Sequence, residues 1–141
     1  MNIAQYTKAA SLEEARELNQ KRSAVVLGGC CWLRLSPQRR IAQAIDLSAL
    51  GLDQIEEGED SFRLGAMVTL GQLEGHDGLA AFTQGAMKEA VRHIVGTQFR
   101  NMATVGGSIS GRFGFSDIWT LFLALDAQVE LYKGGIVSLA D

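Results

Sequence analysis

A glycine-rich stretch, Ala103–Asp117, holds the residues best suited to chemistry. Four glycines fall within its fifteen residues, and Asp117 closes it just before the apolar run Ile118–Leu125. Glycine lets a backbone turn through positive φ and lets a ligand approach without meeting a Cβ. Exposed backbone N–H groups beside glycines suit a phosphate, and the N-terminus of a following helix suits an anion. Taken alone, the stretch is equally compatible with a strand, a tight turn and a helix that bind nothing.

A second glycine corner, Gly28-Gly29, lies about eighty residues earlier in the chain. It follows Ser23–Leu27, a short apolar run that is typical of a buried strand. A strand whose carboxyl end runs into a glycine turn commonly presents backbone amides to a ligand. The chain therefore offers two candidate phosphate-binding loops.

The elements that must position these loops are helices mixed with short strands and hairpins. Ser11–Glu14 matches a capping box and predicts a helix over Leu12–Lys21. Apolar residues at three- and four-residue steps from Leu79 to Ile94 predict an amphipathic helix of about four turns. We also expect a strand at Ala103–Val105, directly before the second glycine corner. This order indicates an α+β fold rather than an alternating parallel βαβ series.

The remaining segments complete this outline. We expect a strand at Ala42–Leu47, hairpins over Gln54–Ala66 and Gln128–Leu139, a short helix after Thr69, and a helix over Ile118–Leu125 capped by Ser116 or Asp117. A soft boundary near Gly51–Asp53 divides the chain into two α+β lobes. Residues 1–52 would hold the first glycine loop, and residues 53–141 the second.

Composition and charge exclude several classes of partner. The net charge is −3, and the sequence lacks the basic stripe that nucleic-acid binding requires. No apolar run approaches the ~18–20 residues that cross a bilayer. The N-terminus has neither a basic n-region nor an apolar h-region. We therefore expect a cytoplasmic protein that binds neither nucleic acid nor membranes.

The cysteines and histidines indicate neither a metal site nor an acid–base centre. Cys30 and Cys31 are adjacent and lack the Cys-x-x-Cys spacing of zinc and iron–sulfur sites. Free cysteine usually behaves as a small hydrophobe, which favours packing over a redox role. His76 and His93 have no Ser, Cys or carboxylate at a suggestive spacing. We expect no catalytic residue and no metal ligand in this chain.

The two glycine corners resemble loops of one protein family, the FAD-binding subunits and domains of the xanthine dehydrogenase and carbon monoxide dehydrogenase family of molybdenum hydroxylases. The family's first loop reads roughly Ala-Gly-Gly-x-x-Leu, and Leu27–Leu33 here reads Leu-Gly-Gly-Cys-Cys-Trp-Leu. Its second loop reads Arg-Asn-x-Ala-Thr-Ile-Gly-Gly-Asn-Ile, and Arg100–Ile109 reads Arg-Asn-Met-Ala-Thr-Val-Gly-Gly-Ser-Ile. Arg63–Leu70 and Leu123–Ala127 match further family stretches in the same order. The long second motif makes the resemblance specific, and it covers nearly the whole chain.

The resemblance implies a two-lobed α+β FAD-binding fold of the PCMH type, which is not a Rossmann sheet, with FAD between the lobes. First-loop amides would wrap the diphosphate, with Thr104 and Gly106–Ser108 on its other side, and Asp117 would accept hydrogen bonds from ribose hydroxyls. The implied cofactor-binding residues are Leu27, Gly28, Gly29, Cys30, Cys31, Trp32 and Leu33 in the first loop, and Ala103, Thr104, Val105, Gly106, Gly107, Ser108 and Asp117 in the second.

The resemblance also implies a place in an oxidoreductase complex. In this family a molybdopterin-binding subunit hydroxylates the substrate, iron–sulfur clusters relay the electrons, and the flavin subunit passes them to NAD or another acceptor. A flavin subunit needs no acid–base residues of its own, because the cofactor performs the redox chemistry. The implied partners are the iron–sulfur subunit and the molybdopterin-binding subunit.

Three positions and the length depart from the family pattern. Ser108 stands where Asn is usual, Cys30-Cys31-Trp32 replaces a polar pair, and Phe113-Gly114-Phe115 replaces a Pro-containing turn. The sequence stops at Asp141 where relatives continue, so we expect a fold incomplete at the C-terminus, in a fragment or a naturally curtailed chain. These departures leave open an alternative, a non-catalytic interaction module that keeps the fold without a functional flavin site.

Overall fold

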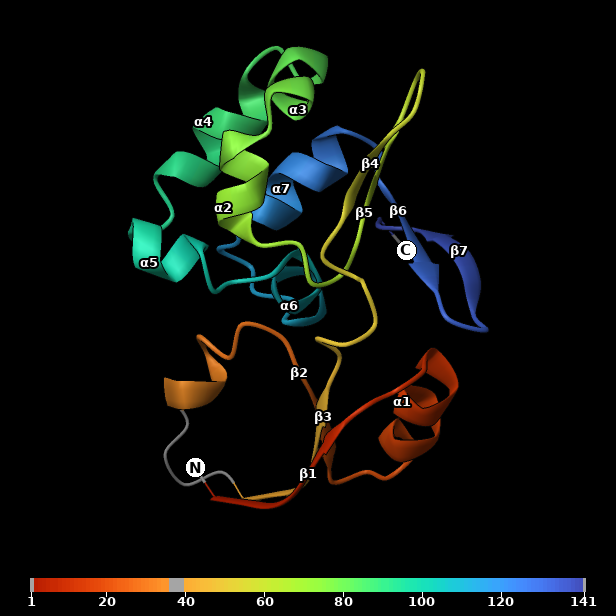
Figure 1. Cartoon of the computed structure of the whole chain (residues 1–141). Helices are drawn as coiled ribbons and strands as arrows, with labels where there is room; N and C mark the ends of the chain where they lie inside the picture. The colour runs from red at the N-terminus through yellow and green to blue at the C-terminus, as the bar shows by residue number, and fades with distance from the viewer. Residues whose placement is uncertain (1, 36–39, 141) are drawn as a thin grey trace.

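The N-terminal part of the chain is built on a three-stranded parallel sheet. The computed structural model describes residues 2–35 and 40–140. Strand β1 leads into helix α1, and strands β2 and β3 follow, with a 3₁₀ turn at Leu33–Leu35 between them; their bounds are β1 Asn2–Lys8, α1 Leu12–Asn19, β2 Ala24–Leu27 and β3 Arg40–Asp46. Both β1 and β2 pair parallel to β3, which lies between them. The carboxyl ends of the three strands therefore share one edge, from which the first glycine loop departs (Figure 1).

Strand β1 and the parallel pairing were not predicted. Six of the seven β1 residues are exposed, because the strand lies at the edge of the sheet and most of its surface faces solvent. Such a strand lacks the alternating apolar pattern on which a prediction depends. The predicted helix at Leu12–Lys21 and the strands at Ser23–Leu27 and Ala42–Leu47 are confirmed within one or two residues at most of their ends.

Helix α1 covers one face of this sheet over a small core of its own. Ser11 Oγ accepts a hydrogen bond from the Glu14 amide at 3.1 Å, as the capping motif predicts. Ala9, Ala15 and Ile45 are buried together, and Leu18, Ala24, Leu47 and Leu50 pack against them.

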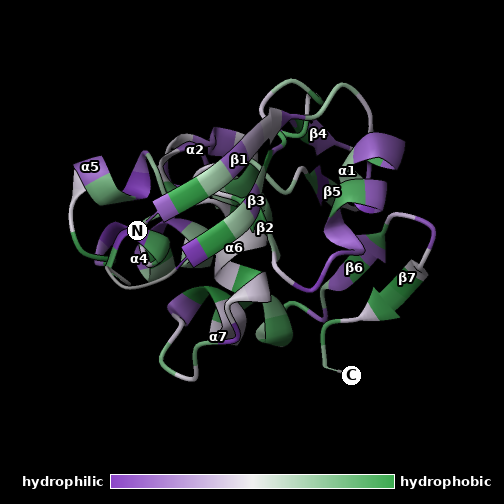
Figure 2. Ribbon diagram, turned by 90° about the horizontal axis from the view of Figure 1, so that it is seen from below, coloured by the Kyte–Doolittle hydropathy of each residue, from purple (hydrophilic) through white to green (hydrophobic). Residues whose placement is uncertain are grey.

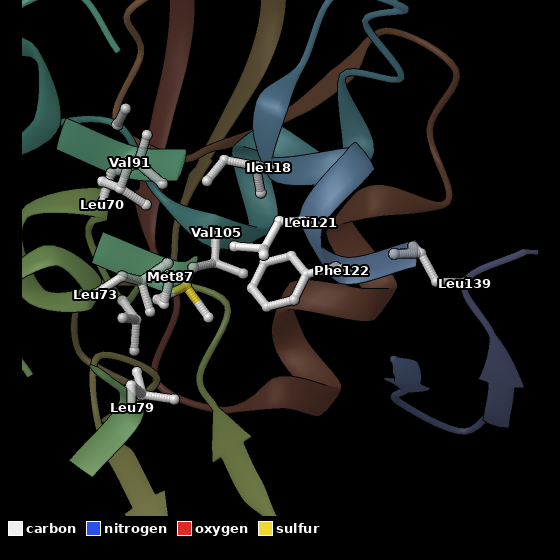
Figure 3. Packing of buried hydrophobic residues seen from close by; sticks show 12 residues of the cluster. Leu70, Leu73, Leu79, Met87, Val91, Val105, Ile118, Leu121, Phe122 and Leu139 are labelled. Atoms are coloured by element: carbon white, nitrogen blue, oxygen red, sulfur yellow. The ribbon is translucent and has the colours of Figure 1, made fainter. Parts of the chain in front are cut away.

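The rest of the chain is a set of short helices flanked by two hairpins. In chain order the elements are β4 Ile55–Glu57, β5 Phe62–Leu64, α2 Leu70–Gly75, α3 Asp77–Phe82, α4 Ala86–Arg92, α5 Thr97–Arg100, α6 Val105–Ser110, α7 Asp117–Ala124, β6 Gln128–Leu131 and β7 Gly135–Ser138. Their apolar faces form the main core, in which Leu121 and Phe122 of α7 lie against Val105 of α6 and Met87 of α4 (Figure 3). Both hairpins and the short helix after Thr69 were predicted and are confirmed.

The predicted four-turn helix from Leu79 to Ile94 is wrong. The chain instead forms α3 and α4, separated by Gln84 and Gly85, whose φ angles of 52° and 86° are left-handed. Thr83 bridges the break: its Oγ1 donates to Leu79 O at 2.7 Å and accepts from the Met87 amide at 3.1 Å. The helical period survives because both helices turn the same apolar side toward the core.

The predicted strand at Ala103–Val105 is also wrong. Only Thr104 makes an isolated bridge, with Thr69, and helix α6 begins at Val105. The Val105 amide donates to Val68 O at 2.8 Å, and the Leu70 amide donates to Ala103 O at 2.9 Å. A β-like crossing between two helix starts therefore replaces the expected strand.

The mixed α+β architecture is confirmed. The sheet lies below α6 in Figure 1 and in front of it in Figure 2, which is viewed from below. Away from the contact between the sheet and α6, two residues of the β6–β7 turn reach α1. Tyr132 Oη donates to a Glu13 carboxylate oxygen at 3.0 Å, and Lys133 forms an ion pair with the same carboxylate.

The lobe boundary near residue 52 remains a prediction. In the part of the chain that the structure describes, no helix has the length and apolar character needed to cross a membrane.

Candidate functional site

The two glycine corners, distant in sequence, touch in the folded chain. A Cβ added to Gly28 would stand 2.8 Å from Thr104 Oγ1 and 3.6 Å from the Gly107 Cα. A Cβ on Gly29 would overlap the backbone carbonyl of Met102. The first loop is therefore packed directly against the start of the second.

Close packing of backbone accounts for several of these glycines without any ligand. Besides Gly29, Gly106 has no room for a side chain, because its Cβ would lie 2.7 Å from Ala66 O and 2.9 Å from the Ala66 Cβ. Gly107 is freer, since only Thr104 Oγ1 lies near its Cβ position, at 3.0 Å. Glycine is required at Gly29 and Gly106 by the neighbouring chain itself.

Several backbone donors of the first loop have no acceptor in the part of the chain that the structure describes. Within residues 2–35 and 40–140, the amides of Gly28, Gly29, Cys30 and Trp32 donate to no protein acceptor. Gly28, Gly29 and Cys30 are partly buried, and partly buried N–H groups are normally paired with protein, water or a ligand. This run of donors, bounded by Leu27 at the end of β2 and Leu33 at the 3₁₀ turn, suits an anion.

The second loop uses its amides inside the protein. Val105 donates to Val68 O and Gly106 to Ala66 O, both at 2.8 Å, while Gly107 donates to Thr104 Oγ1 at 3.2 Å and Ser108 to Thr104 O at 2.9 Å. The Ser108 hydroxyl also bonds to Thr104 O, at 2.9 Å. What the second loop offers a ligand is the hydroxyl proton of Thr104, which hydrogen-bonds no acceptor among the described residues.

Asp117 and Ser116 divide the two roles that the sequence allowed for them. Ser116 is the N-cap of α7, and its Oγ accepts from the Trp119 amide at 3.3 Å. Asp117 occupies the first turn, is exposed, and makes no hydrogen bond or ion pair with the residues that the structure describes. Its carboxylate is free to accept hydrogen bonds from a ligand.

The thiols of the two vicinal cysteines donate to backbone carbonyls of the first glycine loop. Cys30 takes a left-handed φ of 58°, and its thiol donates to Gly28 O at 3.3 Å, while the Cys31 thiol donates to Gly29 O at 3.6 Å. Burial raises the pKa of both thiols, and the neighbouring Cys31 raises that of Cys30 further. Thiols with raised pKa values are poor nucleophiles at neutral pH. Among the described residues, no group of His, Cys, Asp and Glu side chains could hold a metal ion.

Trp32 contacts two residues that sequence reasoning did not place in the site. Its ring centroid lies 5.2 Å from that of Phe113 and 5.6 Å from that of Phe115, both in the connection between α6 and α7. The signal that could have linked them is that Trp32 and the Phe113–Phe115 segment both depart from the family pattern.

A buried ion pair supports the approach to the second loop. Arg100, whose side chain is only 10% exposed, donates from Nε to Glu74 Oε2 at 2.7 Å and from Nη2 to Glu74 Oε1 at 3.4 Å. Arg100 Nη1 also donates to Ile94 O at 3.3 Å. Arg100 therefore ties α5 to α2. A hollow of about 390 Å³ lies elsewhere, among Asp53, Gln54, Ile55, Gln72, Gly75 and His76.

Comparison with known proteins places the chain in a family. A family model described as the FAD binding domain in molybdopterin dehydrogenase matches residues 2–138. The chain belongs to this family. The family expected from the two glycine motifs, and FAD as its cofactor, are thereby confirmed.

Individual relatives agree with this membership. The chain is 32% identical to the uncharacterized protein YgfM of Escherichia coli K12 over 142 residues, which covers 99% of the chain and 53% of that protein. It is 33% identical to the nicotine 6-hydroxylase medium subunit of Paenarthrobacter nicotinovorans, covering 89% of the chain and 46% of the subunit. It is 30% identical to the xanthine dehydrogenase FAD-binding subunit of E. coli O157:H7, covering 94% and 47%. The chain spans about half the length of the curated relatives that it matches.

Solved structures show the same fold. A Cu,Mo-CO dehydrogenase superposes with a TM-score of 0.88 at 26% identity, over 99% of this chain and 52% of that one. The carbon monoxide dehydrogenase of Hydrogenophaga pseudoflava superposes with a TM-score of 0.84 at 25% identity, over 95% and 49%. The incomplete α+β fold expected at the C-terminus agrees with this half coverage.

Proposed function

We propose that this chain binds FAD across the two glycine loops and acts as the flavin-binding part of a molybdenum-hydroxylase-type oxidoreductase. The observation that supports it most is the run of free amides from Gly28 to Trp32, packed against the second family motif. Bound FAD would supply the redox chemistry, and the chain's residues would bind and orient it.

The residues fit a dinucleotide diphosphate unequally. First-loop amides would donate to its oxygens, and the Thr104 hydroxyl would add a donor from the second loop. The carboxylate of Asp117 would accept from ribose hydroxyls, as acidic residues do at other dinucleotide sites. Gly106, Gly107 and Ser108 would not donate from their amides, which are already paired within the protein, and Gly107 would instead pack beside Gly28.

Family membership supports a proposal for the wider function. We propose that the chain assembles with an iron–sulfur subunit and a molybdopterin-binding subunit, and passes electrons from the iron–sulfur clusters through FAD to NAD or another acceptor. The relatives named as a medium subunit and as an FAD-binding subunit support assembly into a complex. A cytoplasmic location belongs to the same proposal.

Titration of the purified chain with FAD tests the binding step. We expect flavin absorbance bands to remain with the protein after gel filtration, and riboflavin, which lacks the diphosphate, to be lost. A colourless protein that also fails to retain added FAD would contradict the proposal and favour a non-catalytic interaction module with this fold.

A further inference from the structure

We propose that Trp32, Phe113 and Phe115 form an aromatic clasp that joins the first glycine loop to the α6–α7 connection and sets how tightly the chain holds FAD. This inference rests on the proposed function and assigns positioning residues to the same site.

The three rings make a closed triangle of contacts. The Phe113 and Phe115 rings stack at 5.4 Å with an interplanar angle of 22°, and Trp32 meets both at tilted angles of 42° and 59°. Aromatic pairs prefer such offset and tilted arrangements at centroid separations of ~4.5–7 Å. The rings come from two segments about eighty residues apart, so the contact ties those segments together.

The clasp lies outside the hydrophobic core. Trp32 is 46% exposed and Phe115 is 69% exposed, and none of the three rings belongs to either buried cluster. Large apolar side chains at the surface stabilise the core little, so their removal should leave the fold intact. Their mutual contact is therefore better explained by the loops that they connect.

Both ends of the clasp adjoin the ligand-binding groups. Trp32 lies within the run of free amides, and Phe115 precedes Ser116 and Asp117, whose carboxylate is free. The contact thus limits the separation between the diphosphate donors and the ribose acceptor. A site held in its binding geometry before the ligand arrives loses less conformational entropy on binding.

Backbone strain beside the clasp supports the same role. Cys30 and Arg112 are non-glycine residues with left-handed φ angles of 58° and 48°, and each precedes a clasp member by one or two positions. Such conformations persist only where the surroundings hold them. The clasp would add restraint next to both residues, in a chain whose α6–α7 turn contains no proline.

Affinity measurements on the whole chain test the clasp. We expect Trp32→Ala and Phe115→Ala each to weaken FAD binding about tenfold. The double variant should bind no more weakly than about the poorer single variant, because Trp32→Ala by itself already removes both ring contacts between the two segments. Trp32→Phe should restore most of the affinity. Thermal unfolding should change little, and alkylation of Cys30 and Cys31 by iodoacetamide should accelerate in both alanine variants.

Phe82→Ala is the matched control. Phe82 is 52% exposed and pairs with Phe62 at 5.2 Å, away from both glycine loops, so its loss should leave FAD affinity unchanged. Single-variant affinities within twofold of the wild type, or effects that multiply in the double variant, would overturn the clasp alone. Failure of the wild-type chain to bind FAD would overturn both the clasp and the proposed function.

Discussion

Gly29 packs against the backbone carbonyl of Met102 with no space for even a methyl group between them. This contact joins the carboxyl edge of the parallel sheet to the residues that precede helix α6. It shows that the two family motifs form one structural unit, in which each loop packs against the other.

Replacing Gly29 should separate the two loops. We expect Gly29→Ala to lower the free energy of unfolding by about 3 kcal/mol, the upper part of the range for overpacking, because the obstacle is backbone rather than a movable side chain. FAD binding should be lost as well. Gly75→Ala is the control: nothing lies within 4 Å of its Cβ position, so urea unfolding should show no loss of stability. Equal stability of the Gly29 variant and wild type would contradict the contact.

Substitutions at Asp117 and Ser116 should have separate effects, the first on FAD binding and the second on the stability of helix α7. We expect Asp117→Asn to weaken FAD binding about tenfold, roughly 1.4 kcal/mol, with a stability loss of only ~0.3–1 kcal/mol from the helix dipole. Ser116→Ala should do the reverse, costing ~1 kcal/mol of stability through the lost cap while FAD affinity stays within twofold. Isothermal titration with FAD and thermal unfolding of both variants provide the comparison. Unchanged affinity in Asp117→Asn would remove Asp117 from the site.

The Glu74–Arg100 pair should be sensitive to the loss of one partner. Glu74→Ala leaves the Arg100 guanidinium buried without its carboxylate, and we expect a loss of about 3 kcal/mol in the free energy of unfolding. The matched variant is Glu89→Ala, which breaks the exposed ion pair with Arg92 and should cost under ~0.5 kcal/mol. Similar losses in both variants would show that burial does not govern the Arg100 pair.

The contact between α1 and the β6–β7 turn should make stability depend on pH. Hydrogen bonds from Lys133 and then Tyr132 hold the pKa of Glu13 below its ordinary value of 4.5. Because the folded pKa is the lower one, this stabilisation is fully present above about pH 4.5 and is lost as the pH falls through the folded pKa. We therefore expect Glu13→Gln to be less stable than wild type at pH 7, with the difference shrinking as the pH falls below about 4.5. Glu17→Gln on the same helix, where no ion pair is formed with described residues, should track the wild type throughout; a constant gap for Glu13→Gln would contradict the pKa assignment.

Much of the fold could be predicted from local signals. The caps at Ser11 and Thr69, and the turn residues of both hairpins, specify their own structure within a few positions. What failed depended on distant partners. The break at Gln84-Gly85 divides the predicted helix in two, although the apolar residues on both sides of it keep their helical spacing. The bridge between Thr69 and Thr104 joins two segments that are distant in sequence.

The residues of the site were predicted from a family pattern. Their packing and hydrogen bonding could be described only from the structure. The sequence shows glycine at positions 29 and 106, but it does not show that Met102 and Ala66 fill the space where their side chains would be. Nor does it distinguish the free amides of the first loop from the paired amides of the second. Both differences arise from tertiary packing between residues that local spacing does not connect.

The contact between the two glycine loops also determines when the FAD site forms during folding. Neither loop is complete until the parallel sheet has docked beneath α6, so the site should arise late in folding, after both hydrophobic clusters have formed. A dinucleotide present at 100 times its Kd would add about 2.7 kcal/mol to the docked state alone. The cofactor would thus stabilise the folded chain, and cells starved of flavin should accumulate a form of this chain in which the two glycine loops are separated. Proteases should cleave that form easily at the separated loops.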